Sequence, residues 1–106
     1  MLELTGKVTY RERIALPAAA EIHVELLALD AWKTIAEVTQ ATHGAQVPIS
    51  FVLAYPADAV DERLVYALRA EIRCDGRVAF VTSDPIPVIT QGHPSCGIEI
   101  RVHTAA

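Results

Sequence analysis

Apolar and polar residues alternate along most of the chain. A period of two is expected of β-strands, because successive side chains of a strand point to opposite faces of a sheet. Five runs show this pattern clearly, and in each the apolar positions would face a common core. The predicted inward positions are Leu2, Leu4, Val8 and Tyr10; Ile22, Val24, Leu26 and Ala28; Val47, Ile49, Phe51, Leu53 and Tyr55; Leu64, Tyr66, Leu68, Ala70 and Ile72; and Ile98, Ile100 and Val102.

The run from Lys33 to Ala41 follows the pattern less strictly. Ala36 and Val38 fall on one face, whereas Ile35 falls on the other. A break of phase within a strand is typical of a β-bulge, and bulges are common at sheet edges. This run is therefore predicted to be an edge strand with a bulge.

Asp75 and Gly76 mark a hairpin between two apolar runs. A two-residue loop would place Phe80 on the polar face, whereas a three-residue loop that includes Cys74 pairs position 72 with 78 and 70 with 80. The second register puts both Val78 and Phe80 on the apolar face. We therefore predict the longer loop, with Gly76 in the left-handed conformation, a bulge, and Cys74 outside the core.

Residues 57–63 form the one polar stretch that is compatible with a helix, of about two turns at most. The rest indicates seven or eight short strands separated by turns. This organisation predicts an all-β fold, an antiparallel β-sandwich. The 106 residues contain no linker or low-complexity segment, so we expect residues 1–106 to form a single domain.

The amino-acid composition and the net charge argue against several classes of protein. The chain is 52% hydrophobic and 21% charged, which argues against intrinsic disorder. Its formal net charge is −4 and its nine basic residues are scattered, so no nucleic-acid partner is expected. No apolar run approaches the ~18 residues of a membrane span, and no targeting segment begins the sequence. These observations leave a cytoplasmic protein and an exported one whose leader has been removed equally open.

The four histidines are His23, His43, His93 and His103. No two of them have a recognisable metal-ligand spacing, and two are on polar strand faces while two are in turns. We therefore expect all four to be exposed to solvent, and we expect no metal site and no cofactor.

Cys74 and Cys96 are the only cysteines. If the last strand pairs antiparallel with the sixth, they lie about eight residues, or ~26 Å, apart. A disulfide needs Cα atoms within ~7 Å. Both cysteines are therefore predicted to be free thiols.

The sequence contains no catalytic signature that we can locate. Asp58, Asp61 and Glu62 form the densest acidic cluster, next to Arg63, and a solvated turn is favoured there over a two-carboxylate site. Arg11-Glu12-Arg13 could bind an anionic group but is more simply the solvated end of the first strand. Transthyretin-like hydrolases match in length and strand number, but their terminal Tyr-Arg-Gly-Ser signature is missing. We expect no enzymatic activity.

Five sequence blocks, in order, resemble the YbaY/YscW family of type III secretion system lipoprotein chaperones. They span most of the chain. The blocks are Leu4 to Pro17 (LTGKVTYRERIALP), Ala20 to Asp30 with its EIHVELL pattern, Gln46 to Phe51 (QVPISF) leading to Tyr55, Tyr66 to Ile72 (YALRAEI) leading to Asp75-Gly76-Arg77, and Pro87 to Pro94 (PVITQGHP).

The resemblance implies an antiparallel sandwich in a bacterial lipoprotein that faces the periplasm and is tethered to the outer membrane by an acylated cysteine ahead of the domain. YscW-like members act as pilotins, which bind a secretin subunit and help it to reach and assemble in the outer membrane. No lipobox precedes Met1, so the only membrane contact expected is through an anchor that this sequence lacks.

A sandwich can accept a strand along an edge or an amphipathic helix in a groove. The predicted edge strand, with Trp32 and Ile35 out of phase, is the candidate binding edge, because tryptophan is enriched in binding hot spots. Alternatively, Trp32 closes one end of the core. An alternative function is a small-ligand or glycan-binding sandwich that uses the end loops around His43-Gly44 and Gly92-His93.

Overall fold

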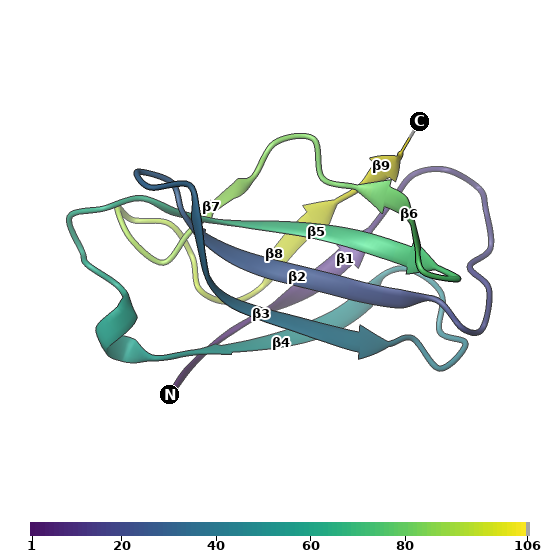
Figure 1. Ribbon diagram of the computed structural model, residues 1–106, viewed down its shortest axis with the longest axis horizontal. Coiled ribbons are helices and arrows are strands. Elements are labelled where there is room, and N and C mark those ends of the chain that lie inside the picture. The colour runs from purple at the N-terminus through teal and green to yellow at the C-terminus, as the bar shows by residue number, and fades with distance from the viewer. Residues whose placement is uncertain (106) are drawn as a thin grey trace.

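A computed structural model describes residues 1–105 and shows two β-sheets packed face to face (Figure 1). Helix is confined to one 3₁₀ turn, η1 (Ala57–Ala59), among the described residues. The strands are β1 (Leu2–Thr9), β2 (Glu21–Ala28), β3 (Lys33–Ala41), β4 (Ile49–Tyr55), β5 (Tyr66–Cys74), β6 (Arg77–Val81), β7 (Ile86–Val88), β8 (Ile98–Arg101) and β9 (His103–Thr104). The all-β sandwich predicted from the sequence is confirmed.

The two sheets differ in size and in strand direction. The smaller has the order β4-β1-β8, and the larger has the order β3-β2-β5-β6-β9, with β7 paired to the start of β5. The expectation of a wholly antiparallel sandwich is wrong at one place, because β8 runs parallel to β1. The chain between β7 and β8 crosses from the larger sheet to the smaller one and enters beside β1 in the same direction. No helix in residues 1–105 is long and apolar enough to cross a membrane.

The core lies between the sheets and is built from the alternating apolar positions. Almost all of the predicted inward residues are buried, and Leu2 is the main exception, because it begins an exposed strand end and is half exposed. Val47 and Leu64 are partly buried at the margins. The largest fully buried side chains are Tyr66, Phe51, Leu4, Ile22, Leu26, Leu27, Leu53, Leu68, Ile72 and Ile100.

Strand β3 is an edge strand with a bulge, as predicted. Leu26 pairs with Ala36 but Leu27 pairs with Thr34, so Ile35 is the extra residue. The bulge explains the break of phase, because it turns Thr34 to the outer face while Ala36 keeps its place beside the core.

The predicted loop between β5 and β6 is wrong. Asp75 and Gly76 both have positive φ, of 52° and 77°, and Cys74 pairs directly with Arg77. The loop therefore has two residues in the conformation that Asp-Gly favours. Cys74 is the last residue of β5 and is partly buried against the core, not a loop residue.

A bulge at Ala79 reconciles this short loop with a buried Phe80. Arg73 pairs with Val78 and Ile72 pairs with Phe80, so Ala79 is the extra residue of β6. Phe80 is thereby returned to the core, whereas Val78 points outward and is 42% exposed. The buried phenylalanine and the bulge are as predicted, but the extra residue is Ala79 in β6 and not Cys74 in the loop.

The segment after β4 is less helical than predicted. Only one 3₁₀ turn forms, and residues 60–65 continue as turn and extended backbone. Asp61 accepts a hydrogen bond from the Arg63 backbone N–H at 2.9 Å, and its Oδ2 lies 2.8 Å from Arg63 Nη2. Asp61 N–H also donates to the Tyr66 hydroxyl at 2.8 Å. The acidic stretch around Asp61 is therefore a turn, which the contacts of Asp61 with Arg63 and Tyr66 stabilise.

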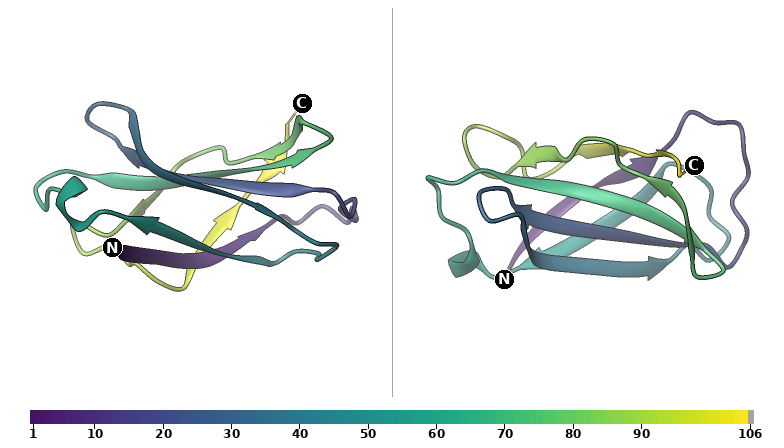
Figure 2. Two further views of the ribbon diagram at one scale, coloured as in Figure 1. Left: turned by 60° about the horizontal axis from the view of Figure 1, so that its bottom comes forward. Right: turned by 45° about the horizontal axis from the view of Figure 1, so that its top comes forward.

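The C-terminal segment joins the two sheets, because β8 belongs to the smaller one and β9 to the larger (Figure 2). Between them, Val102 N–H donates to the Thr9 carbonyl at 2.9 Å. Only His103 and Thr104 pair with β6, whereas β8 pairs with β1, so the last run does not pair with the sixth strand along its whole length. Cys96 is exposed in the loop before β8, and both Cys96 and Cys74 are free thiols.

Gly6 allows β8 to approach β1 closely. It pairs with Ile98, the first residue of β8. A Cβ atom on Gly6 would lie 2.2 Å from the Ile98 carbonyl oxygen, well inside van der Waals contact. Any other residue at this position would push the two strands apart.

We predict that Gly6→Ala lowers the free energy of unfolding by about 1–3 kcal/mol, the usual cost of forcing an extra carbon into a packed site. Urea denaturation measures the change, and Thr5→Ala, one residue earlier on the outer face, is the control. A Gly6→Ala protein as stable as Thr5→Ala would show that β8 can shift without cost.

We predict that the pKa of Asp61 is about 2, below its ordinary 3.8, because hydrogen bonds from Arg63 stabilise the carboxylate. Since the folded pKa is the lower one, the stabilisation is fully present above about pH 4 and is lost as the pH falls towards 2. Carboxyl NMR titration should show that Arg63→Gln raises this pKa, whereas Arg77→Gln leaves it unchanged. An unaltered pKa in Arg63→Gln would contradict the assignment.

Candidate functional site

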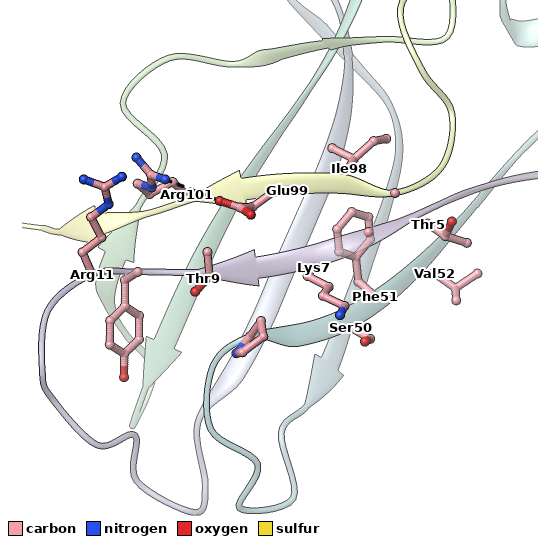
Figure 3. A pocket seen from close by; sticks show the side chains of 14 residues that line it. Thr5, Lys7, Thr9, Arg11, Ser50, Phe51, Val52, Ile98, Glu99 and Arg101 are labelled. Atoms are coloured by element: carbon pink, nitrogen blue, oxygen red, sulfur yellow. Dashed lines mark hydrogen bonds and ion pairs between the residues drawn. The ribbon is translucent and has the colours of Figure 1, made fainter.

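The outer face of the three-stranded sheet forms an open groove of about 790 Å³ (Figure 3). Strand β1 runs along its middle, with β4 on one side and β8 on the other. Its lining residues are Thr5, Gly6, Lys7, Thr9, Tyr10, Arg11, Pro48, Ser50, Phe51, Val52, Gly97, Ile98, Glu99 and Arg101.

Strand register arranges the outward side chains in rows across the groove. Lys7 lies between Ser50 on β4 and Glu99 on β8, while Thr5 pairs with Val52 and Thr9 pairs with Arg101. The alternation that buries one face of β1 therefore presents its polar positions here. Val52 is 48% exposed and, with Pro48, supplies exposed apolar surface.

The groove is cationic in a chain that is acidic overall. It contains Lys7, Arg11 and Arg101 but only one carboxylate, Glu99, whereas the formal net charge of the chain is −4. Arg101 Nη2 lies 3.5 Å from Glu99 Oε1, an exposed pair that holds neither group firmly. Within residues 1–105, no carboxylate lies within ion-pair distance of Lys7 or Arg11. These cations are free to meet a negatively charged partner.

Tyr10 lies just after β1 at one end of the groove and packs into the core. Its ring stacks on Phe80 of the other sheet, with ring centroids 4.3 Å apart and planes 5° from parallel. Its hydroxyl donates to the Ile14 carbonyl. Burial raises the Tyr10 pKa, aided by the nearby Cys74 and Glu12, so the hydroxyl stays neutral and keeps its donor proton.

The neighbouring stretch Arg11-Glu12-Arg13 is divided between two roles. Arg11 lines the groove, whereas Glu12 accepts hydrogen bonds from the backbone N–H of Thr104 at 3.0 Å and from its hydroxyl at 2.9 Å. The hydroxyl bond is the main cause that lowers the Glu12 pKa. Glu12 thus fastens the C-terminal strand, and Arg11 remains available in the groove.

A second polar cluster lies on the outer face of the larger sheet. His23, predicted to be exposed, is only 5% exposed, so that prediction is wrong. Its Nδ1 lies 2.6 Å from Thr39 Oγ1 and its Nε2 lies 3.0 Å from Glu25 Oε1. Strand β2 lies between β3 and β5, and Thr39 and Glu71 on these two neighbours lie opposite His23.

Glu25 is held by several donors at once. Arg69 Nη2 lies 2.8 Å from its Oε2, and Thr34 Oγ1 donates to the same oxygen at 3.2 Å. Burial would raise the Glu25 pKa, but the hydrogen bonds from Arg69 and His23 outweigh burial and leave it below its ordinary value. The carboxylate is therefore ionised at neutral pH.

The sequence pattern contained a signal for this cluster. His23 and Glu25 are two residues apart and so share a strand face. Spacing along the chain does not indicate the rest of the cluster, because the other members come from a paired strand, where Glu37 lies opposite Glu25 and Thr39 opposite His23.

The remaining histidines and loops are separated. His43, His93 and His103 are exposed, as predicted. The loop with His43-Gly44 follows the end of β3 that pairs with Glu21, whereas the loop with Gly92-His93 follows β7, which pairs with Tyr66. Because Glu21 and Tyr66 lie at opposite ends of the β2–β5 pair, these two loops do not form one site.

The two residues of the predicted binding edge have different environments. Trp32 lies in the turn between β2 and β3 with φ of 51° and is 59% exposed, so it does not close the core. Ile35 is partly buried and packs against the core. Neither residue lines the groove on the smaller sheet.

Comparison with known proteins agrees with the resemblance found in the sequence. The chain matches the family described as type III secretion system lipoprotein chaperone (YscW) over residues 1–99. It is 37% identical over 94 residues to the uncharacterized lipoprotein YbaY of Escherichia coli (strain K12), a match that covers 84% of this chain and 49% of that lipoprotein. The chain thus spans about half the length of this relative.

A solved structure gives the same answer for the fold. An alternative pilotin from the type II secretion system of Vibrio cholerae superposes with a TM-score of 0.92 at 34% sequence identity, covering 99% of this chain and 97% of that one. The structural similarity therefore extends over both sheets. The chain belongs to the YscW family of type III secretion system lipoprotein chaperones.

Proposed function

We propose that this chain is a pilotin-like domain that binds a segment of a secretin subunit in the groove on the smaller sheet, and that it acts by binding and not by catalysis. The observation that carries the proposal is a cationic groove with exposed apolar surface, in a fold that superposes on a pilotin. The family description as a lipoprotein chaperone points to the same kind of role.

The proposed location follows from the relatives. A pilotin, a lipoprotein and a family of lipoprotein chaperones all match this chain. We therefore propose that the domain lies in the bacterial envelope, on the periplasmic side of the outer membrane, as part of a lipid-anchored protein. Such a position would keep the groove within reach of secretin subunits as they arrive at the membrane.

The groove suits an amphipathic segment. Val52 and Pro48 offer apolar contact along β4, and Lys7 lies beside them on β1. Arg11 and Arg101 lie together at the far end of the groove (Figure 3). A helix laid on this face would place apolar residues over β4 and acidic residues over the cations. Electrostatic complementarity of this kind sets partner choice and association rate.

Trp32 is a second candidate contact, favoured by its exposure. An exposed tryptophan in a turn can anchor a partner through a large apolar contact. It lies outside the groove, so variants of the two surfaces separate them experimentally. The small-ligand alternative would need two separate sites, because its two loops lie at opposite ends of the larger sheet.

We predict that one peptide, among overlapping peptides that tile the secretins of the source bacterium, binds this chain saturably in fluorescence anisotropy. Reversing two groove charges, in Arg11→Glu with Arg101→Glu, should weaken that binding at least about tenfold, because each reversal turns attraction into repulsion. Raising the salt concentration should weaken it as well, since exposed charges are screened.

The matched control is the double variant Arg13→Glu with Arg77→Glu, which makes the same charge change at exposed sites outside the groove. Equal loss in both doubles would indicate a nonspecific charge effect and would reject the groove. Loss on Trp32→Ala, with the groove variants unaffected, would move the binding surface to the turn. Binding of no secretin peptide would overturn the proposed partner.

A further inference from the structure

The outer face of the larger sheet carries a cluster of possible metal ligands that the proposed function does not use. His23 and Glu25 project from β2, and Glu37 projects from the edge strand β3 opposite Glu25. One ligand atom from each of the three lies within 4.8 Å of the others.

The separations suit a small ion. His23 Nε2 lies 3.0 Å from Glu25 Oε1 and 4.0 Å from Glu37 Oε1. Ligands of a tetrahedral ion with bonds of ~2.0–2.1 Å lie ~3.3 Å apart. The two distances fall on either side of that value. Glu37 is an exposed side chain on an edge strand, so it can close the remaining gap.

The buried His23 and the partly buried Glu25 are each held through their other polar atom. Thr39 Oγ1 lies 2.6 Å from His23 Nδ1, which leaves Nε2 facing the carboxylates. Thr34 and Arg69 bind Oε2 of Glu25, at 3.2 Å and 2.8 Å, and leave its Oε1 facing His23. Outer contacts of this kind orient ligands in metal sites and raise their affinity for the ion.

The charge around the cluster also favours a cation. Arg69 pairs with Glu25 and Arg73 pairs with Glu71, whereas no arginine of residues 1–105 pairs with Glu37, so these five side chains leave one net negative charge. A hollow of about 300 Å³ opens beside His23 and Glu25, on the side of the cluster that faces Arg69 and Glu71 of β5.

From this geometry we propose that His23, Glu25 and Glu37 bind a first-row divalent transition metal ion, with water at the fourth position. One imidazole nitrogen and two carboxylate oxygens are a donor set suited to Zn²⁺, whereas Mg²⁺ and Ca²⁺ prefer oxygen alone. Binding through Nε2 requires the neutral imidazole to carry its proton on Nδ1, from which it donates to Thr39 Oγ1.

The site is independent of the groove, because it lies on the other sheet. Its structural effect is to join the edge strand β3 to β2 through side chains. It was not expected from the sequence, since strand pairing and not chain spacing assembles the three ligands.

The test is isothermal titration of the chelator-treated chain with Zn²⁺, together with NMR of the His23 ring nitrogens. We expect one ion per chain and a shift of the Nε2 signal. Glu37→Gln should weaken binding at least about tenfold, by analogy with the 10–100-fold losses seen even for outer contacts of metal sites. Glu37 is exposed, so this variant keeps its fold. His23→Gln should abolish binding.

The controls are His43→Gln, which removes an exposed histidine, Glu99→Gln, which removes an exposed carboxylate, and Cys96→Ser, which removes an exposed thiol. All three should bind Zn²⁺ like the parent chain. The proposal is overturned if no saturable binding is found, if Glu37→Gln binds as tightly as the parent, or if binding is lost in Cys96→Ser.

Discussion

The close approach of β8 to β1 is the constraint on which the rest of the structure depends. It is possible only because Gly6 has no side chain where the Ile98 carbonyl passes. This contact adds the third strand to the smaller sheet and directs the chain onward to β9 in the larger one. The Val102 backbone N–H then donates a hydrogen bond to the Thr9 carbonyl at the junction of the two sheets. One glycine thereby determines both the width of the smaller sheet and the way in which the C-terminal segment joins the two sheets.

The same contact creates the groove. Without β8, Lys7 and Thr9 would lie on an open edge, and Glu99 and Arg101 would not face them. The outer faces of the two sheets consequently differ in character. The groove on the smaller one is cationic, with charges that have few partners among the described residues. On the larger one, His23, the carboxylates and the arginines form one cluster of hydrogen bonds and ion pairs.

Much of the fold could be predicted from the sequence, because the alternation of apolar and polar residues indicates which side chains of a strand face the core. The strand register predicted from the sequence was wrong where a β-bulge adds one residue to a strand. The bulge in β6 falls at Ala79, and the loop is the short one that Asp75 and Gly76 favour, because both residues adopt positive φ. A pattern of apolar residues indicates that a strand contains a bulge, but it does not indicate which residue is the extra one. The buried His23 was missed for a related reason, since its neighbours come from β3 and β5.

The sequence by itself determined the fold class, the core positions, the edge strand and the family, since these depend on local alternation and on motifs in fixed order. Only the tertiary structure decided which polar residues meet. Lys7, Arg11 and Arg101 share a groove because β8 lies parallel to β1, and the outward positions of β2 gain their neighbours from strand register. Register and strand order are set by contacts between segments far apart in the chain, and no local pattern encodes them.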